Sequence, residues 1–116
     1  MSMRIYIKDL ELPLTILRKK SELEKGMKGK TSIDGCYLFM LQDDETHSFW
    51  MKDCLIPLDI IFCDNNRIVK IFHNCPPCTK DTCRKYSHWG NVVLEMAGGT
   101  CDQNGISEGD SFDTFL

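Results

Sequence analysis

The stretch Leu58-Asp59-Ile60-Ile61-Phe62-Cys63 is almost continuously apolar, and Tyr37-Leu38-Phe39-Met40-Leu41 has the same character. A strand with one face in water alternates apolar and polar side chains, whereas strands of this kind are buried on both faces. The sequence predicts too few helices to cover both faces of an open sheet, because only short helical segments begin near Ser21 and Cys101. A sheet that curls into a barrel, with a helix against its outside or in one end, provides the missing cover.

Further β-forming runs and turn residues extend this prediction along the chain. Asp64-Asn65-Asn66-Arg67 joins two strand-like runs closely enough to form a hairpin. Pro13 indicates an edge strand or an extended segment at Leu12–Leu17, because proline cannot donate a hydrogen bond to a sheet. The predicted strands are Arg4–Lys8, Leu12–Leu17, Cys36–Leu41, Phe49–Met51, Leu58–Cys63, Ile68–Phe72, Val92–Met96 and Ser111–Phe115. We therefore expect one α+β, mostly β domain over residues 1–116, with a small barrel-like antiparallel or mixed sheet and one or two short helices.

Both helices are predicted from local signals. Ser21-Glu22-Leu23-Glu24 has the spacing of a capping box, with Ser21 as the N-cap and Glu24 reaching back to it. This helix should end at about Met27, because Gly26 and Gly29 favour an exit there. The second helix is expected at Cys101–Asn104.

Composition and charge exclude several classes of protein. The chain has 116 residues, of which 42% are hydrophobic and 27% are charged, as in ordinary globular domains. A net charge of −3 argues against nucleic acid as a partner. No apolar run approaches the roughly 20 residues that span a bilayer, and no signal-peptide pattern is present, so we expect no membrane association and a cytoplasmic location. The seven cysteines, an odd number, fit poorly with a closed disulfide framework and favour a reducing compartment.

The central segment, residues 49–62, carries a resemblance to a known family. Its sequence Phe-Trp-Met-Lys-Asp-Cys-Leu-Ile-Pro-Leu-Asp-Ile-Ile-Phe resembles the signature of the domain of unknown function 192 family, Phe-Trp-Met-Lys-Asn-Thr-x-Ile-Pro-Leu-Asp-Ile-x-Phe. Asp53 and Cys54 replace the common Asn-Thr pair. Flanking stretches at residues 35–39 and 93–99 are also similar, so the resemblance extends from about residue 12 to residue 115. It implies a small barrel-like β domain and carries no assigned function.

Four polar or aromatic residues in this segment form the first candidate site. Trp50 and Lys52 share one face of a regular strand, and Asp59 lies inside an apolar strand, where an unpaired carboxylate is costly. Lys52 is the expected partner of Asp59. One interpretation is a core tryptophan with a structural ion pair or a capping carboxylate. The other is a polar ligand pocket at one end of the barrel, lined by Trp50, Lys52, Asp53 and Asp59, with Trp50 as a stacking platform.

A cysteine-rich loop is the second candidate. Cys75, Cys78 and Cys83, with His73 or His88, supply the ligand types that zinc prefers in a tetrahedral site. A thiol redox function is the alternative suggested by Cys75-Pro-Pro-Cys78, although the two prolines cannot donate hydrogen bonds to a thiolate. A structural disulfide, for instance Cys78–Cys83, and free thiols are the remaining interpretations.

The sequence favours a binding function over an enzymatic one. It places no nucleophile, base and orienting group together, as an active site requires. Glu95 is expected to face outward from its strand. We therefore expect a non-catalytic binding or accessory domain for a small polar ligand or a protein. A zinc-stabilised interaction module is the alternative, and a thiol redox enzyme or a hydrolase with Asp59 as base is a third.

Overall fold

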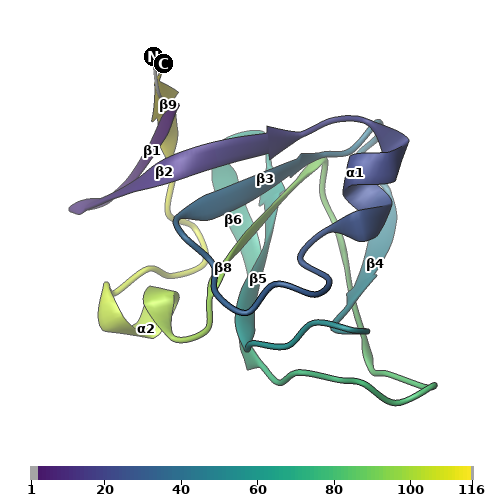
Figure 1. Cartoon of the computed structure of the whole chain (residues 1–116). Helices are drawn as coiled ribbons and strands as arrows, with labels where there is room; N and C mark the ends of the chain where they lie inside the picture. Colours follow the sequence, from purple (N-terminus) through teal and green to yellow (C-terminus); the bar gives the residue numbers. More distant parts are fainter. Residues whose placement is uncertain (1–2, 116) are drawn as a thin grey trace.

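The computed structural model describes residues 3–115 and contains a curled seven-stranded sheet and a separate two-stranded sheet (Figure 1). The large sheet has the order β6-β5-β8-β3-β2-β1-β9, and β4 and β7 form the small one. β2 and β3 pair in parallel, and the other neighbouring pairs are antiparallel. The predicted mostly β, barrel-like fold with one or two short helices is therefore confirmed, and the large sheet curls into a half-barrel. The elements are β1 Arg4–Ile7, β2 Leu10–Leu17, α1 Lys20–Lys25, β3 Cys36–Met40, β4 Thr46–Trp50, β5 Leu58–Asp64, β6 Arg67–Cys75, β7 Lys85–Trp89, β8 Val92–Ala97, α2 Thr100–Gln103 and β9 Asp113–Phe115.

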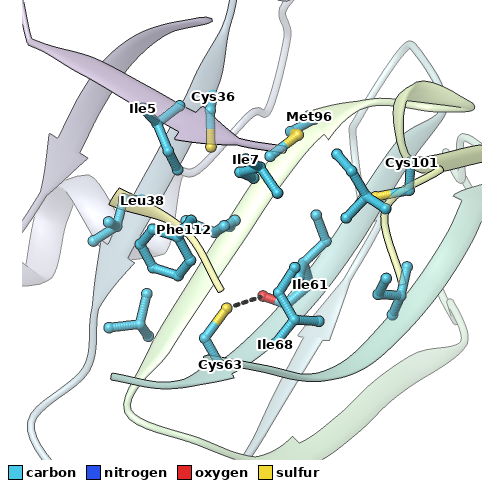
Figure 2. Packing of buried hydrophobic residues seen from close by; sticks show 14 of the residues in the cluster. Ile5, Ile7, Cys36, Leu38, Ile61, Cys63, Ile68, Met96, Cys101 and Phe112 are labelled. Carbon is cyan, nitrogen blue, oxygen red and sulfur yellow. Dashed lines mark hydrogen bonds between the residues drawn. The ribbon is translucent and has the colours of Figure 1, made fainter. Parts of the chain in front are cut away.

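Each face of the central strands is buried in a different core. In β5, Ile61 and Cys63 belong to one core, and Ile60 and Phe62 belong to the other. Figure 2 shows the first core, where residues of β1, β3, β5, β6 and β8 meet the segment after β8. The second core lies under the two-stranded sheet, since Phe49 of β4 makes an edge-to-face contact with Phe62 of β5. The continuous apolar strands are thus covered on both faces, as their sequence predicts.

The C-terminal segment joins the two edges of the curled sheet. Ile68 of β6 donates a backbone hydrogen bond to Asp110, and Phe112 donates one to Asn66 at the β5–β6 turn. β9 then pairs with β1 at the opposite edge. This connection covers backbone groups that an open sheet would leave unpaired.

The sequence did not predict β7, which it assigned to the cysteine-rich loop. Residues 85–89 alternate between exposed and buried positions, with Tyr86 buried, which is the pattern of a half-buried strand. β7 pairs with β4 along its whole length, from Thr46 opposite Trp89 to Trp50 opposite Lys85. The two strands need each other, because an isolated strand cannot satisfy its backbone.

Two local predictions were wrong. β2 is an interior strand, between β1 and β3, and not an edge strand. Pro13 is tolerated there because pairing with β3 begins only at Leu14. The N-cap of α1 is Lys19, two residues before Ser21, and Glu22 accepts the backbone N–H groups of Arg18 and Lys19. Glu22 therefore plays the part predicted for Glu24.

No helix within residues 3–115 is long and apolar enough to cross a lipid bilayer.

Candidate functional site

Asp59 is a structural residue with its own set of partners. Its side chain is fully buried and accepts backbone N–H groups from Asn74 at 2.7 Å, Gly99 at 3.1 Å and Cys101 at 2.9 Å. These donors come from the end of β6 and from the turn that leads into α2. Asp59 therefore fixes the start of α2 from a neighbouring strand, which matches the interpretation as a capping carboxylate.

Lys52 does not pair with Asp59, so that prediction was wrong. The Lys52 ammonium donates to the backbone carbonyl of Lys80 and lies 4.0 Å from the carboxylate of Asp53. Asp53 is exposed and has a backbone φ of 60°, which aspartate and asparagine tolerate better than most residues. Its N–H donates to the carbonyl of Cys78 at 2.8 Å, and its carbonyl accepts from Gly29 at 3.0 Å. Lys52 and Asp53 thus connect the end of β4 to two loops.

The predicted zinc ligands are separated in the fold. Cys78 and Cys83 are joined in a disulfide, which is one of the alternatives that the sequence allowed. Cys75 is a buried free thiol in the second core, and burial raises its pKa to about 11, although a hydrogen bond with Tyr86 opposes this. His73 lies 3.4 Å from Asp102 of α2, away from the disulfide loop. Within residues 3–115 no three His, Cys, Asp or Glu side chains are grouped to hold a metal ion.

Glu95 is a buried carboxyl group that the sequence analysis placed incorrectly on the surface. It lies near the C-terminal end of β8, opposite Tyr37 of β3 and Ile60 of β5. Its side chain points to the second core, because the flanking Leu94 and Met96 belong to the first. The residue is only 4% exposed. Glu95 therefore carries a carboxyl group into a face that is otherwise apolar.

No hydrogen bond joins the Glu95 carboxyl to the protein groups of residues 3–115. Every fully enclosed side-chain nitrogen or oxygen in this part of the chain has a hydrogen-bond partner. The carboxyl oxygens must consequently retain contact with open space, and Glu95 lines a pocket of about 90 Å³. The Glu95 carboxyl therefore faces the pocket with hydrogen-bonding capacity that residues 3–115 leave unused.

This pocket lies between the C-terminal end of α1 and β4, over β3 and β8. Phe39, Phe49 and Cys54 form its apolar wall. Lys25, Lys28, Lys52 and Glu24 contribute its charged groups, and its other lining residues are Gly26, Met27, Ser48 and Trp50. Two residues of the predicted site, Trp50 and Lys52, therefore line the same pocket as Glu95, whereas Asp53 and Asp59 do not.

Burial controls the ionisation of the groups inside the pocket. It raises the pKa of Glu95 to about 8, so this carboxyl group holds its proton at neutral pH. Burial also raises the pKa of Cys54 to about 11, and the nearby Glu95 adds to that rise while Lys28 opposes it. A thiol with such a pKa is a poor nucleophile at neutral pH. The pocket is therefore suited to hold a ligand rather than to attack one.

A second hollow continues from the pocket along β4. It has a volume of about 270 Å³ and is lined by Ser48, Phe49, Trp50 and Lys85. The first three residues also line the pocket beside Glu95. Trp50 is 43% exposed and lines both spaces. A ligand with its polar end beside Glu95 can therefore extend over the indole ring.

A larger hollow of about 390 Å³ lies at the disulfide loop. Its lining includes the disulfide, Pro76, Pro77 and Arg84, whose guanidinium stacks 4.5 Å from the ring centre of Tyr86. It contains no buried carboxyl, histidine or free thiol. We therefore regard the pocket beside Glu95 as the better candidate site despite its smaller size.

Comparison with known proteins identifies the family. The model of the DUF192 family, described as "Uncharacterized ACR", matches residues 3–114. The chain belongs to the DUF192 family. No curated protein matches the sequence. The resemblance that was based on residues 49–62 is thereby confirmed for almost the whole chain.

Two solved structures share the fold. One is a protein of Sinorhizobium meliloti described as a "putative transcription regulator", with 24% identity and a TM-score of 0.83 over 97% of this chain and 91% of that one. The other is a protein of unknown function from Novosphingobium aromaticivorans, with 26% identity and a TM-score of 0.80 over 97% of this chain and 83% of that one. Both support the half-barrel fold of this DUF192 member.

The sequence contained a weak signal for Glu95. Val92-Val93-Leu94-Glu95-Met96 is apolar at every position except Glu95. Asp59 interrupts the apolar run Leu58–Cys63 in the same way. Like Leu58–Cys63, a strand that is almost continuously apolar is buried on both faces. A carboxyl group inside it should then have been expected in a core and not on the surface.

Proposed function

We propose that this DUF192 domain is a non-catalytic binding domain whose ligand site is the pocket between α1 and β4. The observation that carries the proposal is Glu95, which is 4% exposed, lines the pocket and has no hydrogen-bond partner among residues 3–115. A ligand in the pocket would supply the hydrogen-bond partner that residues 3–115 do not provide for this carboxyl. The predicted cytoplasmic location is compatible with this function and is not needed for it.

Trp50 and Lys52 keep part of the role that the sequence suggested for them. Trp50 offers an exposed aromatic face next to the pocket, and aromatic rings supply a large contact area for ligands. Lys52 lies at the pocket's charged side, although its ammonium is already bonded to the Lys80 carbonyl. Pockets of this type combine apolar walls with a few polar groups that fix orientation.

An NMR screen of small polar compounds against the 15N-labelled full chain tests the proposal. We expect at least one compound to shift the backbone amides around the pocket, namely those of Gly26, Phe49, Cys54 and Glu95, in a saturable way. Ser48→Phe would place a ring in the pocket and should abolish these shifts.

Ser87→Phe is the matched control for that variant. Ser48 and Ser87 are cross-strand neighbours whose hydroxyls are 2.7 Å apart, so either substitution breaks the same hydrogen bond. Of the two, Ser48 lines the pocket and Ser87 does not. Binding that survives both substitutions, or no shift of the pocket amides with any compound, would contradict the proposed site.

A further inference from the structure

The charges around the pocket indicate which kind of ligand it takes. Lys25 and Lys28 line it, and neither forms an ion pair with an acidic side chain of residues 3–115. The third lysine, Lys52, is held by the Lys80 carbonyl and lies near Asp53. Glu24 is the acidic group among the exposed lining residues, and it lies 3.9 Å from Lys20. The entrance is therefore positively charged overall.

The interior of the pocket offers a hydrogen-bond donor rather than a negative charge. Burial raises the pKa of Glu95 to about 8, and no charged neighbour contributes to this shift. The other titratable groups on this face beside Glu95 are the thiol of Cys54, from the loop after β4, and Tyr37 of β3, which is directly opposite Glu95 in the register. Burial raises the pKa of the Cys54 thiol to about 11, so this group is also uncharged at neutral pH. On β5, the facing residue is the apolar Ile60.

We propose that the pocket binds the carboxylate group of a small organic acid, with the buried carboxyl of Glu95 donating a hydrogen bond to it. This inference rests on the proposed function and specifies its ligand class. Lys25 and Lys28 attract the anion to the entrance, and an O–H···O⁻ hydrogen bond to Glu95 holds it inside. Hydrogen bonds in which one partner is charged are about twice as strong as neutral ones.

The volumes agree with this ligand class. The pocket beside Glu95 holds about 90 Å³, close to the share of three water molecules in the liquid, which suits a carboxylate head group. The adjoining hollow of about 270 Å³ along Trp50 has room for an apolar or aromatic body. We therefore expect an arylacetate to fit better than acetate itself.

The test is an NMR titration of the full chain with sodium phenylacetate at constant ionic strength. Phenylacetamide and phenethylamine serve as the uncharged and the cationic probe of similar shape. We expect phenylacetate to bind most tightly of the three and to shift the amides of Cys54 and Glu95. Its affinity should be about tenfold weaker at pH 9 than at pH 7, because Glu95 loses the donated proton near pH 8.

Three variants separate the contributions. Glu95→Gln retains an N–H donor, so phenylacetate should still bind, but with the same affinity at pH 7 and pH 9. Lys28→Met should weaken binding about threefold or more at low salt, because the lysine lies at the entrance. Lys30→Met is its control, since Lys30 lies over the ring of Tyr37 and outside this pocket.

The outcomes distinguish the two proposals. Tighter binding of phenethylamine than of phenylacetate, with an affinity that rises from pH 7 to pH 9, would overturn the organic-acid inference and leave the pocket as a binding site. Phenylacetate binding with no dependence on pH in the wild-type protein would also overturn the role of Glu95. If the three probes and the broader screen all leave the pocket amides unmoved, the proposed function itself fails.

Discussion

Asp59 and Glu95 are buried acids on adjacent strands, yet they meet opposite environments. Asp59 of β5 is one register position from Glu95 of β8, and the two side chains point to opposite faces of the sheet. Three backbone N–H groups surround Asp59, whereas Glu95 meets an apolar wall and a pocket. A buried carboxyl whose oxygens are all bonded holds the fold together. One that faces a pocket without a partner is a candidate for ligand recognition.

The largest expected effect comes from removing the charge of Asp59. Asp59→Asn turns an acceptor-only group into one that presents an NH₂ group to backbone donors, so at least one of the three N–H groups loses its partner. We expect the free energy of unfolding to fall by roughly 3 to 5 kcal/mol. Urea denaturation followed by circular dichroism measures it. A loss below about 1 kcal/mol would mean that these hydrogen bonds are not what fixes α2.

Glu95→Gln, in contrast to Asp59→Asn, should stabilise the folded protein relative to the wild type. The size of this stabilisation should depend on pH. In the unfolded chain a glutamate loses its proton near pH 4.5, whereas burial retains the proton in the folded protein up to about pH 8. Between these values the folded state binds more protons, so the free energy of unfolding falls as the pH rises. The wild-type protein should lose on the order of 4 kcal/mol more than the variant between about pH 5 and pH 9.

Urea denaturation of both proteins at several pH values in that range measures this difference. The comparison between the variants removes the contribution of all other titrating groups. Parallel pH profiles for the wild-type protein and Glu95→Gln would show that Glu95 is ionised at neutral pH and that its burial does not control its proton.

A smaller effect is expected at the turn that supplies the donors of Asp59. A Cβ at Gly98 would lie 2.4 Å from Oδ1 of Asn74 and 3.0 Å from Cβ of Pro57. Gly98→Ala should therefore displace the turn and lower the free energy of unfolding by about 2 kcal/mol. Gly29→Ala controls for the loss of a glycine without a collision, since it has open space but a φ of 73°. Thermal denaturation that ranks Gly29→Ala as the worse variant would argue against the close approach.

The smallest expected effect is a difference in reactivity between two buried thiols of the unchanged protein, one on each face of the sheet. Cys54 lines the pocket and is 4% exposed, whereas Cys101 lies in the first core and is fully buried. Burial raises the pKa of both thiols, so both should react slowly in the folded state. We expect N-ethylmaleimide to label Cys54 before Cys101, as followed by peptide mass spectrometry. Equal rates, or faster labelling of Cys101, would mean that the pocket is not the more open side.

Features that depend on residues close together in the sequence could be predicted, whereas features that depend on residues far apart in the sequence could not. The hairpin at Asp64–Arg67 was predicted because turn residues act locally, and β5 and β6 do pair antiparallel there. β7 was missed because its cysteine-rich flank suggested a metal loop, although its own alternation was that of a strand. The Cys78–Cys83 disulfide was one of several open alternatives, since spacing alone does not distinguish a bridge from a metal site.

The sequence by itself determined the barrel-like fold, because continuous apolar strands with few helices leave few ways to bury both faces of a sheet. It also indicated the family, through the signature at residues 49–62. It also indicated that a carboxylate within β5 needs partners, since burying a charge without them is too costly. Only the tertiary structure decided which partners those are. Backbone N–H groups of β6 and α2, remote in sequence, reach Asp59, and Lys52 does not. Likewise, the role of Glu95 depends on the side of β8 on which it lies and on the end of α1 that leaves a pocket beside it.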